Sequence, residues 1–164
     1  MASENNFAYI DGANLHKGVA ELCWKLDYKR FRIWLRDKFK VEKAYLFIGL
    51  VPGNKDLYTK LQEAGYILVY KEVTYDGNGK VKGNCDADLV LRTVCDTYEN
   101  AFDKAILISS DGDYSGLVKF LMERNKFKAI LSPATAKKCS ILLKRTGANI
   151  VYIDDQKTLL HWSK

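Results

Sequence analysis

Short apolar runs alternate along the chain with segments in which apolar residues recur every three or four positions. Runs of the first kind predict buried β-strands, and segments of the second kind predict amphipathic helices. The apolar runs occupy residues 7–11, 44–50, 66–73, 105–109, 128–131 and 149–153. Strands that alternate with helices in this way are typical of an α/β layer fold with a central, mostly parallel sheet.

Each helix predicted between these strands has an apolar face. The expected core residues are Leu15, Val19 and Leu22; Tyr28, Phe31, Trp34, Leu35 and Phe39; Leu57, Leu61 and Ala64; Leu91, Val94, Cys95 and Tyr98; and Tyr114, Leu117, Val118, Leu121 and Met122. A last helix is expected at about 138–145, with Gly147 ending it. The turn sequence at 76–79, Asp-Gly-Asn-Gly, predicts a hairpin in which Lys80 and Val81 pair back on the strand at 66–73.

The length and charge narrow the class of protein. The 164 residues suffice for one α/β domain and show no linker, so we expect a single domain over 1–164. Lys and Arg number 26 against 20 Asp and Glu, and the net charge of +6 favours polyanionic partners such as nucleic acid. No apolar run approaches the roughly 18 residues that span a bilayer, so we expect a cytoplasmic protein that does not bind membranes. The four cysteines form no CxxC pair, and we expect free thiols, three of them buried.

Five carboxylates fall where an α/β sheet builds its site. Asp11 ends the first strand, Asp111 and Asp113 follow the strand at 105–109, and Asp86 and Asp88 begin the helix before that strand. Ligands of open parallel sheets bind beyond the carboxyl ends of the strands. The sequence therefore predicts that three separate segments bring these acids to one edge.

Helix capping and metal binding are the two interpretations of these acids. An Asp or Asn at a helix start commonly caps it, which explains Asp88, Asp113 and Asn14 taken singly. Capping does not explain Asp11 and Asp111, because a carboxylate that ends a buried strand is costly without a partner. A hard cation such as Mg²⁺ or Mn²⁺ would offset the repulsion of the whole set. Asp86 is the preferred ligand over Asp88, since residues two apart on a helix point about 200° from one another.

Three motifs in these segments resemble the NYN domain family, in particular the LabA-like branch of the PIN-like nucleases. They are YIDGANL near the N-terminus, KGNCDADLVL in the middle and ISSDGDYSGLVKFL after it. Their order and spacing cover residues 7–153, with a short tail beyond. The resemblance implies a Rossmann-like, PIN-type three-layer sandwich and an acidic pocket that binds Mg²⁺ or Mn²⁺.

The resemblance also implies an endoribonuclease in which metal-activated water hydrolyses the phosphodiester. Carried over by position, the metal-site acids are Asp11, Asp86, Asp111 and Asp113, with Asn14 as the polar companion of the first. The substrate contacts expected at the pocket rim are Lys82, Ser110 and Asp88. Two positions depart from the family pattern: Ser110 replaces a glycine, and Arg92 stands where relatives can carry a further acid.

The rival interpretation is an RNA-binding or regulatory module without turnover, motivated by Arg92, and a metal-dependent phosphatase is a third. Two groups of basic residues are either solvated faces or phosphate-binding surfaces. The first group is Lys29, Arg30, Arg32, Arg36, Lys38, Lys40 and Lys43, and the second is Lys119, Arg124, Lys126, Lys128, Lys137, Lys138, Lys144 and Arg145. The RNA target and the oligomeric state, a homodimer included, stay open.

Overall fold

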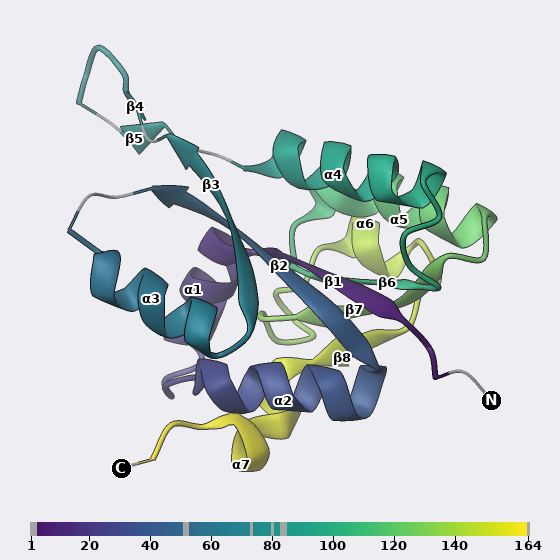
Figure 1. Ribbon diagram of the computed structural model, residues 1–164, viewed down its shortest axis with the longest axis horizontal. Helices are drawn as coiled ribbons and strands as arrows, with labels where there is room; N and C mark the ends of the chain where they lie inside the picture. The colour runs from purple at the N-terminus through teal and green to yellow at the C-terminus, as the bar shows by residue number, and fades with distance from the viewer. Residues whose placement is uncertain (1–2, 51–52, 73, 80, 83–84, 164) are drawn as a thin grey trace.

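A six-stranded parallel sheet forms the centre of the protein, as a computed structural model shows (Figure 1). The structure describes residues 3–50, 53–72, 74–79, 81–82 and 85–163. The strands are β1 (Asn6–Asp11), β2 (Val41–Leu50), β3 (Tyr66–Glu72), β6 (Ala105–Ile108), β7 (Phe127–Ser132) and β8 (Ile150–Tyr152), and they lie in the order β3-β2-β1-β6-β7-β8. The parallel α/β architecture expected from the sequence is confirmed.

Helices cover both faces of the sheet and complete three layers (Figure 1). One face carries α1 (Gly12–Glu21), α2 (Tyr28–Phe39), α3 (Lys55–Glu63) and the short α7 (Lys157–Leu160), and the other carries α4 (Asp86–Tyr98), α5 (Ser115–Glu123) and the short α6 (Ile141–Lys144). Single 3₁₀ turns, η1 (Gly112–Tyr114) and η2 (Ile153–Gln156), precede α5 and α7. None of the helices in the described residues is long and apolar enough to cross a membrane.

The strand order reverses between β1 and β6. The chain leaves β1 for β2 and β3 on one side and returns to β6 on the other side of β1. Such a switch point leaves a crevice at the carboxyl ends of the two strands, which is where α/β proteins bind ligands. Asp11 ends β1, and Asp111 follows β6 after two residues, so both lie at this crevice.

Alternation along β1 decides which way Asp11 faces. Ala8 and Ile10 belong to the core under α1 and α2, whereas Phe7 and Tyr9 belong to the core under α4 and α5. Side chains alternate between the two faces of a strand. Asp11 therefore shares the α4 face with Phe7 and Tyr9.

The predicted hairpin forms, but not as an extension of the third strand. Strand β4 (Thr74–Tyr75) pairs antiparallel with β5 (Val81–Lys82), and the two make a separate sheet that projects from the body of the protein (Figure 1). Lys80 and Val73, which were expected in the pairing and in the third strand, lie outside the described residues. The helix expected at 138–145 is also shorter, a single turn after the Ser140 cap.

The face of α4 that meets the sheet differs from the prediction. Leu91, Cys95 and Tyr98 were expected in the core and are exposed, while Leu89, Thr93 and Asp96 are buried. Thr93 donates its hydroxyl hydrogen to the carbonyl of Leu89, and Asp96 accepts a hydrogen bond from Tyr9, so the buried polar groups are satisfied. Periodicity of apolar residues misses a buried face that is two-thirds polar.

The cysteines are free thiols, but fewer are buried than expected. Only Cys139 is buried; Cys85 is partly exposed, and Cys23 and Cys95 are exposed.

Gly12 lets α1 begin directly at the end of β1. A Cβ atom on Gly12 would lie 2.6 Å from the carbonyl oxygen of Phe47 and 2.5 Å from Cγ2 of Ile48. These distances are far below van der Waals contact, and the first involves backbone that cannot step aside. The tight turn that places Asp11 at the crevice thus requires a glycine for reasons of space.

We expect Gly12→Ala to lower the free energy of unfolding by about 1–3 kcal/mol, because the added methyl group overpacks the contact between β1 and β2. The midpoint and slope of urea unfolding measure the change. Gly116→Ala is the matched control: no atom lies within 4 Å of its added Cβ, and the change is expected to stabilise α5 by about 0.4–1 kcal/mol. Equal stability of G12A and the wild type would show that β1 and β2 can separate at no cost.

Candidate metal centre

Three carboxylates meet at the switch point. One oxygen atom from each of Asp11, Asp86 and Asp111 lies within 4.8 Å of the others. Asp11 is 8% exposed, and Asp86 and Asp111 are partly buried. The sequence prediction that separate segments deliver acids to one edge is confirmed for these three residues.

Two of the three acids also cap helices. Asp11 Oδ1 accepts the backbone N–H of Asn14 at 3.1 Å at the start of α1, and Asp111 Oδ1 accepts that of Asp113 at 2.9 Å at the start of η1. The sequence had suggested caps at Asp88, Asp113 and Asn14 instead. Because a cap uses one oxygen of a carboxylate that has two, capping and metal binding are compatible at Asp11 and Asp111.

Asp86 reaches the crevice from the first position of α4. The helix precedes β6 in the chain and runs opposite to it, so its N-terminus lies at the carboxyl edge of the sheet. A helix N-terminus stabilises a negative charge. Asp88, two residues on, lies 3.8 Å from Lys71 Nζ in an exposed ion pair and is not part of the cluster.

Tyr114 holds two of the carboxylates through its hydroxyl group. The oxygen lies 3.0 Å from Oδ2 of Asp11 and 2.8 Å from Oδ1 of Asp86, and the ring is buried. A phenol has one proton to donate, and its oxygen can also accept. The hydroxyl group is within donor distance of both carboxylates, and its single proton can serve one of them at a time.

The environment of Asp11 disfavours its ionised form. Burial raises the pKa of Asp11, and the charges of Asp86 and Asp111 raise it further, against the lowering effect of its hydrogen bonds from Asn14 and Tyr114. Burial and the neighbouring carboxylates also raise the pKa of Tyr114, which stays a neutral phenol. Burial raises the pKa of the adjacent Cys85 thiol to about 11, so this cysteine offers no thiolate at neutral pH.

Asn14, in the first turn of α1, joins this helix to the loop that follows β6. Its side-chain oxygen accepts the backbone N–H of Ser110 at 3.0 Å and the Ser110 hydroxyl at 3.2 Å. The Ser109 hydroxyl in turn accepts the N–H of Asp111 at 3.1 Å. These bonds fix the loop that carries Asp111, and they engage the Ser110 hydroxyl that was expected to contact substrate.

Two other predicted site residues lie apart from the three acids. Asp113 is exposed and is not in the cluster, although it lies two residues beyond Asp111. Lys82 lies in β5 of the projecting hairpin, and its side chain is outside the described residues. Their proposed roles as metal ligand and substrate contact stay predictions.

The model of the NYN domain family matches residues 7–153, about nine-tenths of the chain. The chain belongs to the NYN domain family. Among solved structures, a Vibrio parahaemolyticus protein described as of unknown function superposes with a TM-score of 0.78 at 23% identity, covering 98% of this chain and 99% of the other. That likeness shows a shared fold and no more. Among proteins with curated descriptions, none matches this chain.

NYN domains are a PIN-like nuclease family, and the three-acid cluster of this NYN domain fits a divalent cation. Carboxylate oxygens are the ligands that Mg²⁺ and Mn²⁺ prefer. Within the described part of the chain, neither Asp11 nor Asp111 forms an ion pair with Lys or Arg. A bound cation would place a positive charge beside Asp11 and Asp111.

Arg92 of this NYN domain is engaged away from the three acids. Its Nε lies 3.3 Å from Oδ2 of Asp96, and its guanidinium contacts the ring and hydroxyl of Tyr45. Tyr9 donates a 2.7 Å hydrogen bond to the same oxygen of Asp96. Arg92 therefore balances a buried carboxylate of its own helix, which accounts for a basic residue at this position.

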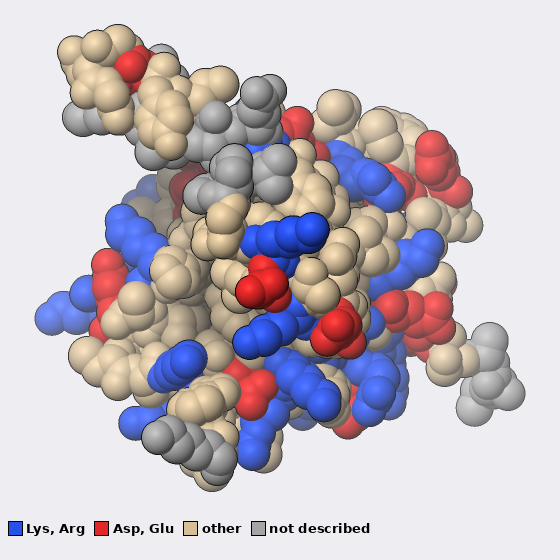
Figure 2. All heavy atoms as spheres, turned by 60° about the vertical axis from the view of Figure 1, so that its left-hand side comes forward, with Lys and Arg blue, Asp and Glu red and all other residues tan. Residues whose placement is uncertain are grey.

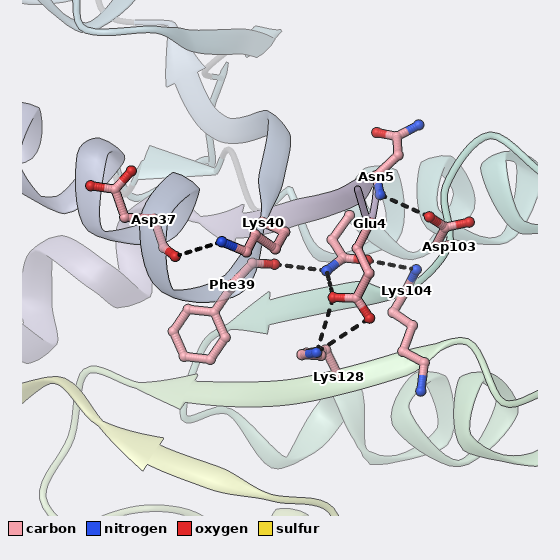
Figure 3. Close-up of polar contacts among 9 residues, drawn as sticks. Glu4, Asn5, Asp37, Phe39, Lys40, Asp103, Lys104 and Lys128 are labelled. Carbon is pink, nitrogen blue, oxygen red and sulfur yellow. Dashed lines mark hydrogen bonds and ion pairs between the residues drawn. The ribbon is translucent and has the colours of Figure 1, made fainter. Parts of the chain in front are cut away.

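Several of the described basic residues lie away from the cluster or are engaged in the fold. Lys40, Lys104 and Lys128 lie at the amino end of the sheet, where Lys128 pairs with Glu4 (Figure 3). Arg32 donates to the carbonyls of Gly65, Val41 and Glu42 and so ties α2 to the sheet. Acidic and basic side chains are interspersed over the face in Figure 2. Lys40, Lys104, Lys128 and Arg32 therefore fit solvated or structural positions and not a phosphate track beside the NYN acids.

Two residues of the site were missed from the sequence. Tyr114 was interpreted as core packing, which its burial confirms, but its hydroxyl bridges Asp11 and Asp86. Ser109 was assigned only to a strand. The sequence feature that could have predicted this role is the hydroxyl group of Tyr114, on the apolar face of a helix and directly after two acids.

We expect Asp11→Asn to raise the free energy of unfolding at pH 7 in the absence of metal. The folded-state pKa of Asp11 lies above its unfolded value, so ionising this carboxyl destabilises the fold as pH rises through that window. Asn removes the charge and still caps α1. The gain should vanish below the unfolded pKa of about 3.9, where the wild-type carboxyl is protonated in both states.

Unfolding in urea between pH 3 and pH 7 measures this difference. Asp27→Asn is the matched control, because Asp27 caps α2 with the same 3.1 Å bond but has Arg30 beside it instead of two carboxylates. D27N should be no more stable than the wild type at any pH. A D11N protein that is less stable at pH 7 would contradict the charge repulsion inferred for the cluster.

Proposed function

We propose that this NYN domain is a metal-dependent endoribonuclease, acting as a single domain. The observation that supports the proposal is the convergence of Asp11, Asp86 and Asp111 within 4.8 Å at the switch point of the sheet. The NYN match supports the reaction class, since NYN nuclease domains act on RNA. The three quoted motifs favour the LabA-like branch; that assignment, a cytoplasmic location and a homodimer stay predictions.

The residues of the site either would bind the cation or position those that do. Asp11, Asp86 and Asp111 would hold Mg²⁺ or Mn²⁺, and the bound cation would activate water and stabilise charge on the phosphodiester. Tyr114 keeps Asp11 and Asp86 aligned by hydrogen bonding to both. Asn14 fixes the loop of Asp111 through Ser110. Because the pKa of Asp11 is raised, protons would compete with a cation for this carboxylate as the pH falls.

The rival function is RNA binding without turnover. Its motivation was Arg92, which pairs with Asp96 and is engaged by Tyr45. Because this arginine is balanced within its own helix, it gives no reason for an inactive pocket. We therefore favour the nuclease.

A direct prediction concerns metal binding. Mn²⁺ at 100 times its dissociation constant should stabilise the wild-type protein by about 2.7 kcal/mol. The same Mn²⁺ concentration should give almost no stabilisation of Asp11→Asn or Asp86→Asn, whereas Asp27→Asn should respond as the wild type does. Thermal unfolding with and without Mn²⁺ measures the effect. No stabilisation of the wild type by Mn²⁺ or Mg²⁺ would mean that the three acids serve only the fold, with Asp11 and Asp111 as helix caps.

A second prediction concerns turnover. A mixed RNA pool should be cut in Mg²⁺ or Mn²⁺, and cleavage should cease with EDTA. The rate of RNA cleavage should be about 100- to 1,000-fold lower in Asp11→Asn, as expected when the site loses several kcal/mol of charge stabilisation in the transition state. Gel analysis of end-labelled RNA measures the rate, and D27N is again the control. RNA that is bound but intact in every metal would favour the rival, and hydrolysis of a small phosphate ester alone would favour a phosphatase.

A further inference from the structure

An apolar groove adjoins the three acids. It has a volume of about 480 Å³, which falls within the roughly 300–1,000 Å³ of small-molecule sites. The lining residues are Asp86, Ala87, Val90, Leu91, Val94, Asp113 and Tyr114. Asp86 and Tyr114 belong to both the groove and the metal centre, so a ligand in the groove lies directly beside the cluster.

The groove exists because of the way α4 is rotated on the sheet. The helix buries Leu89, Thr93 and Asp96, and this leaves Leu91 64% exposed. Leu91 and Val94 then present an apolar wall to solvent next to a charged site. A flat apolar ligand bound against Leu91 and Val94 would remove these side chains from water. The favourable free energy is proportional to the apolar area that the ligand covers.

Asp113 restricts the chemistry of a flat ligand that could bind in this groove. Asp113 lines the groove, is exposed and forms no ion pair or side-chain hydrogen bond within the described part of the chain. An ionised carboxylate only accepts hydrogen bonds, and its two oxygens suit two parallel donors. Among the four RNA bases, only guanine has two adjacent donors on one edge, at N1 and N2. Adenine and cytosine have an acceptor beside their amino group, and uracil has one donor between two acceptors.

We propose that this groove binds the base of a nucleotide next to the scissile phosphate, and that Asp113 selects guanine there. The proposal rests on the proposed function for the identity of the ligand as RNA. The base lies on the wall made by Val90, Leu91 and Val94, and its N1–H and N2–H₂ donate to the carboxylate of Asp113. This role replaces the metal-ligand role that the family resemblance implies for Asp113.

The first experiment is binding of free nucleosides without metal, measured by titration calorimetry or by NMR shifts of the α4 amides. Guanosine should bind more tightly than adenosine, cytidine or uridine by at least about fivefold, the lower limit for a bidentate base contact. Asp113→Asn should reduce guanosine binding to the level of uridine, and Glu123→Gln, at an exposed acid of α5, should leave it unchanged. Equal binding of all four nucleosides, or none, would overturn the proposal.

The apolar wall is tested by a pair of variants on the same helix. Leu91→Ala should weaken guanosine binding several-fold, whereas Tyr98→Ala should not, because Tyr98 is 72% exposed on α4 but does not line the groove. Equal effects of the two would mean that the groove is not the binding site. A dimer that dissociates on Leu91→Asp would show that a second copy covers the groove, and it would also overturn the proposal.

A third experiment separates this inference from the nuclease itself. Sequencing of the cut ends from wild-type digestion should show guanosine enriched on one side of the break. Guanosine binding with no RNA cleavage would support the base site and contradict the nuclease function. Cleavage without base preference would support the nuclease function and contradict the base site. Loss of Mn²⁺ stabilisation in Asp113→Asn as complete as in Asp11→Asn would identify Asp113 as a ligand and overturn its role in base selection.

Discussion

Three carboxylates that repel one another must be held together in a partly buried crevice, and much of the architecture around the switch point serves that constraint. Repulsion between like charges at this separation is strong wherever water is partly excluded. Backbone N–H groups take one oxygen of Asp11 and one of Asp111, the N-terminus of α4 supports Asp86, and the Tyr114 hydroxyl joins Asp11 to Asp86. Burial and, to a smaller extent, the remaining repulsion raise the pKa of Asp11. A proton can relieve the repulsion in the absence of metal, and a divalent cation can relieve it more completely.

The elements that bring these acids together are simple consequences of parallel topology. Strands β1 and β6 are neighbours whose connections leave in opposite directions, so the residues that follow them share one crevice. Gly12 allows the turn from β1 into α1, and alternation along β1 turns Asp11 toward α4. The acidic cluster is therefore built from loop starts and helix starts on a rigid sheet, an arrangement that suits precise placement of ligands.

The sequence predicts the parallel sheet and the three acids, because both depend on strong local signals: apolar strand runs, and acids that follow a strand or begin a helix. It fails on α4, where Thr93 and Asp96 are buried and Leu91 is exposed. No local pattern predicts this, since the burial of Asp96 depends on Tyr9 in a distant strand. The bridging role of Tyr114 and the pairing of the 74–82 hairpin apart from the main sheet are likewise set by tertiary contacts. The basic runs likewise do not indicate how their residues are distributed over the surface, because that depends on how the helices and loops pack.

The hydrogen bond between Tyr9 and Asp96 connects α4 to β1 near the C-terminal end of the helix and limits the movement of the helix. The buried hydrogen bond of 2.7 Å between Tyr9 and Asp96 weakens steeply when its length or angle departs from a narrow range, so it resists movement of α4 relative to β1. Arg92 clamps the same carboxylate from the side. Asp96 lies near one end of the helix, and Asp86 lies at the other. The contacts of Asp96 with Tyr9 and Arg92 thus fix the position of α4 along the direction of β1. They thereby set the distance between Asp86 and Asp11 in the crevice.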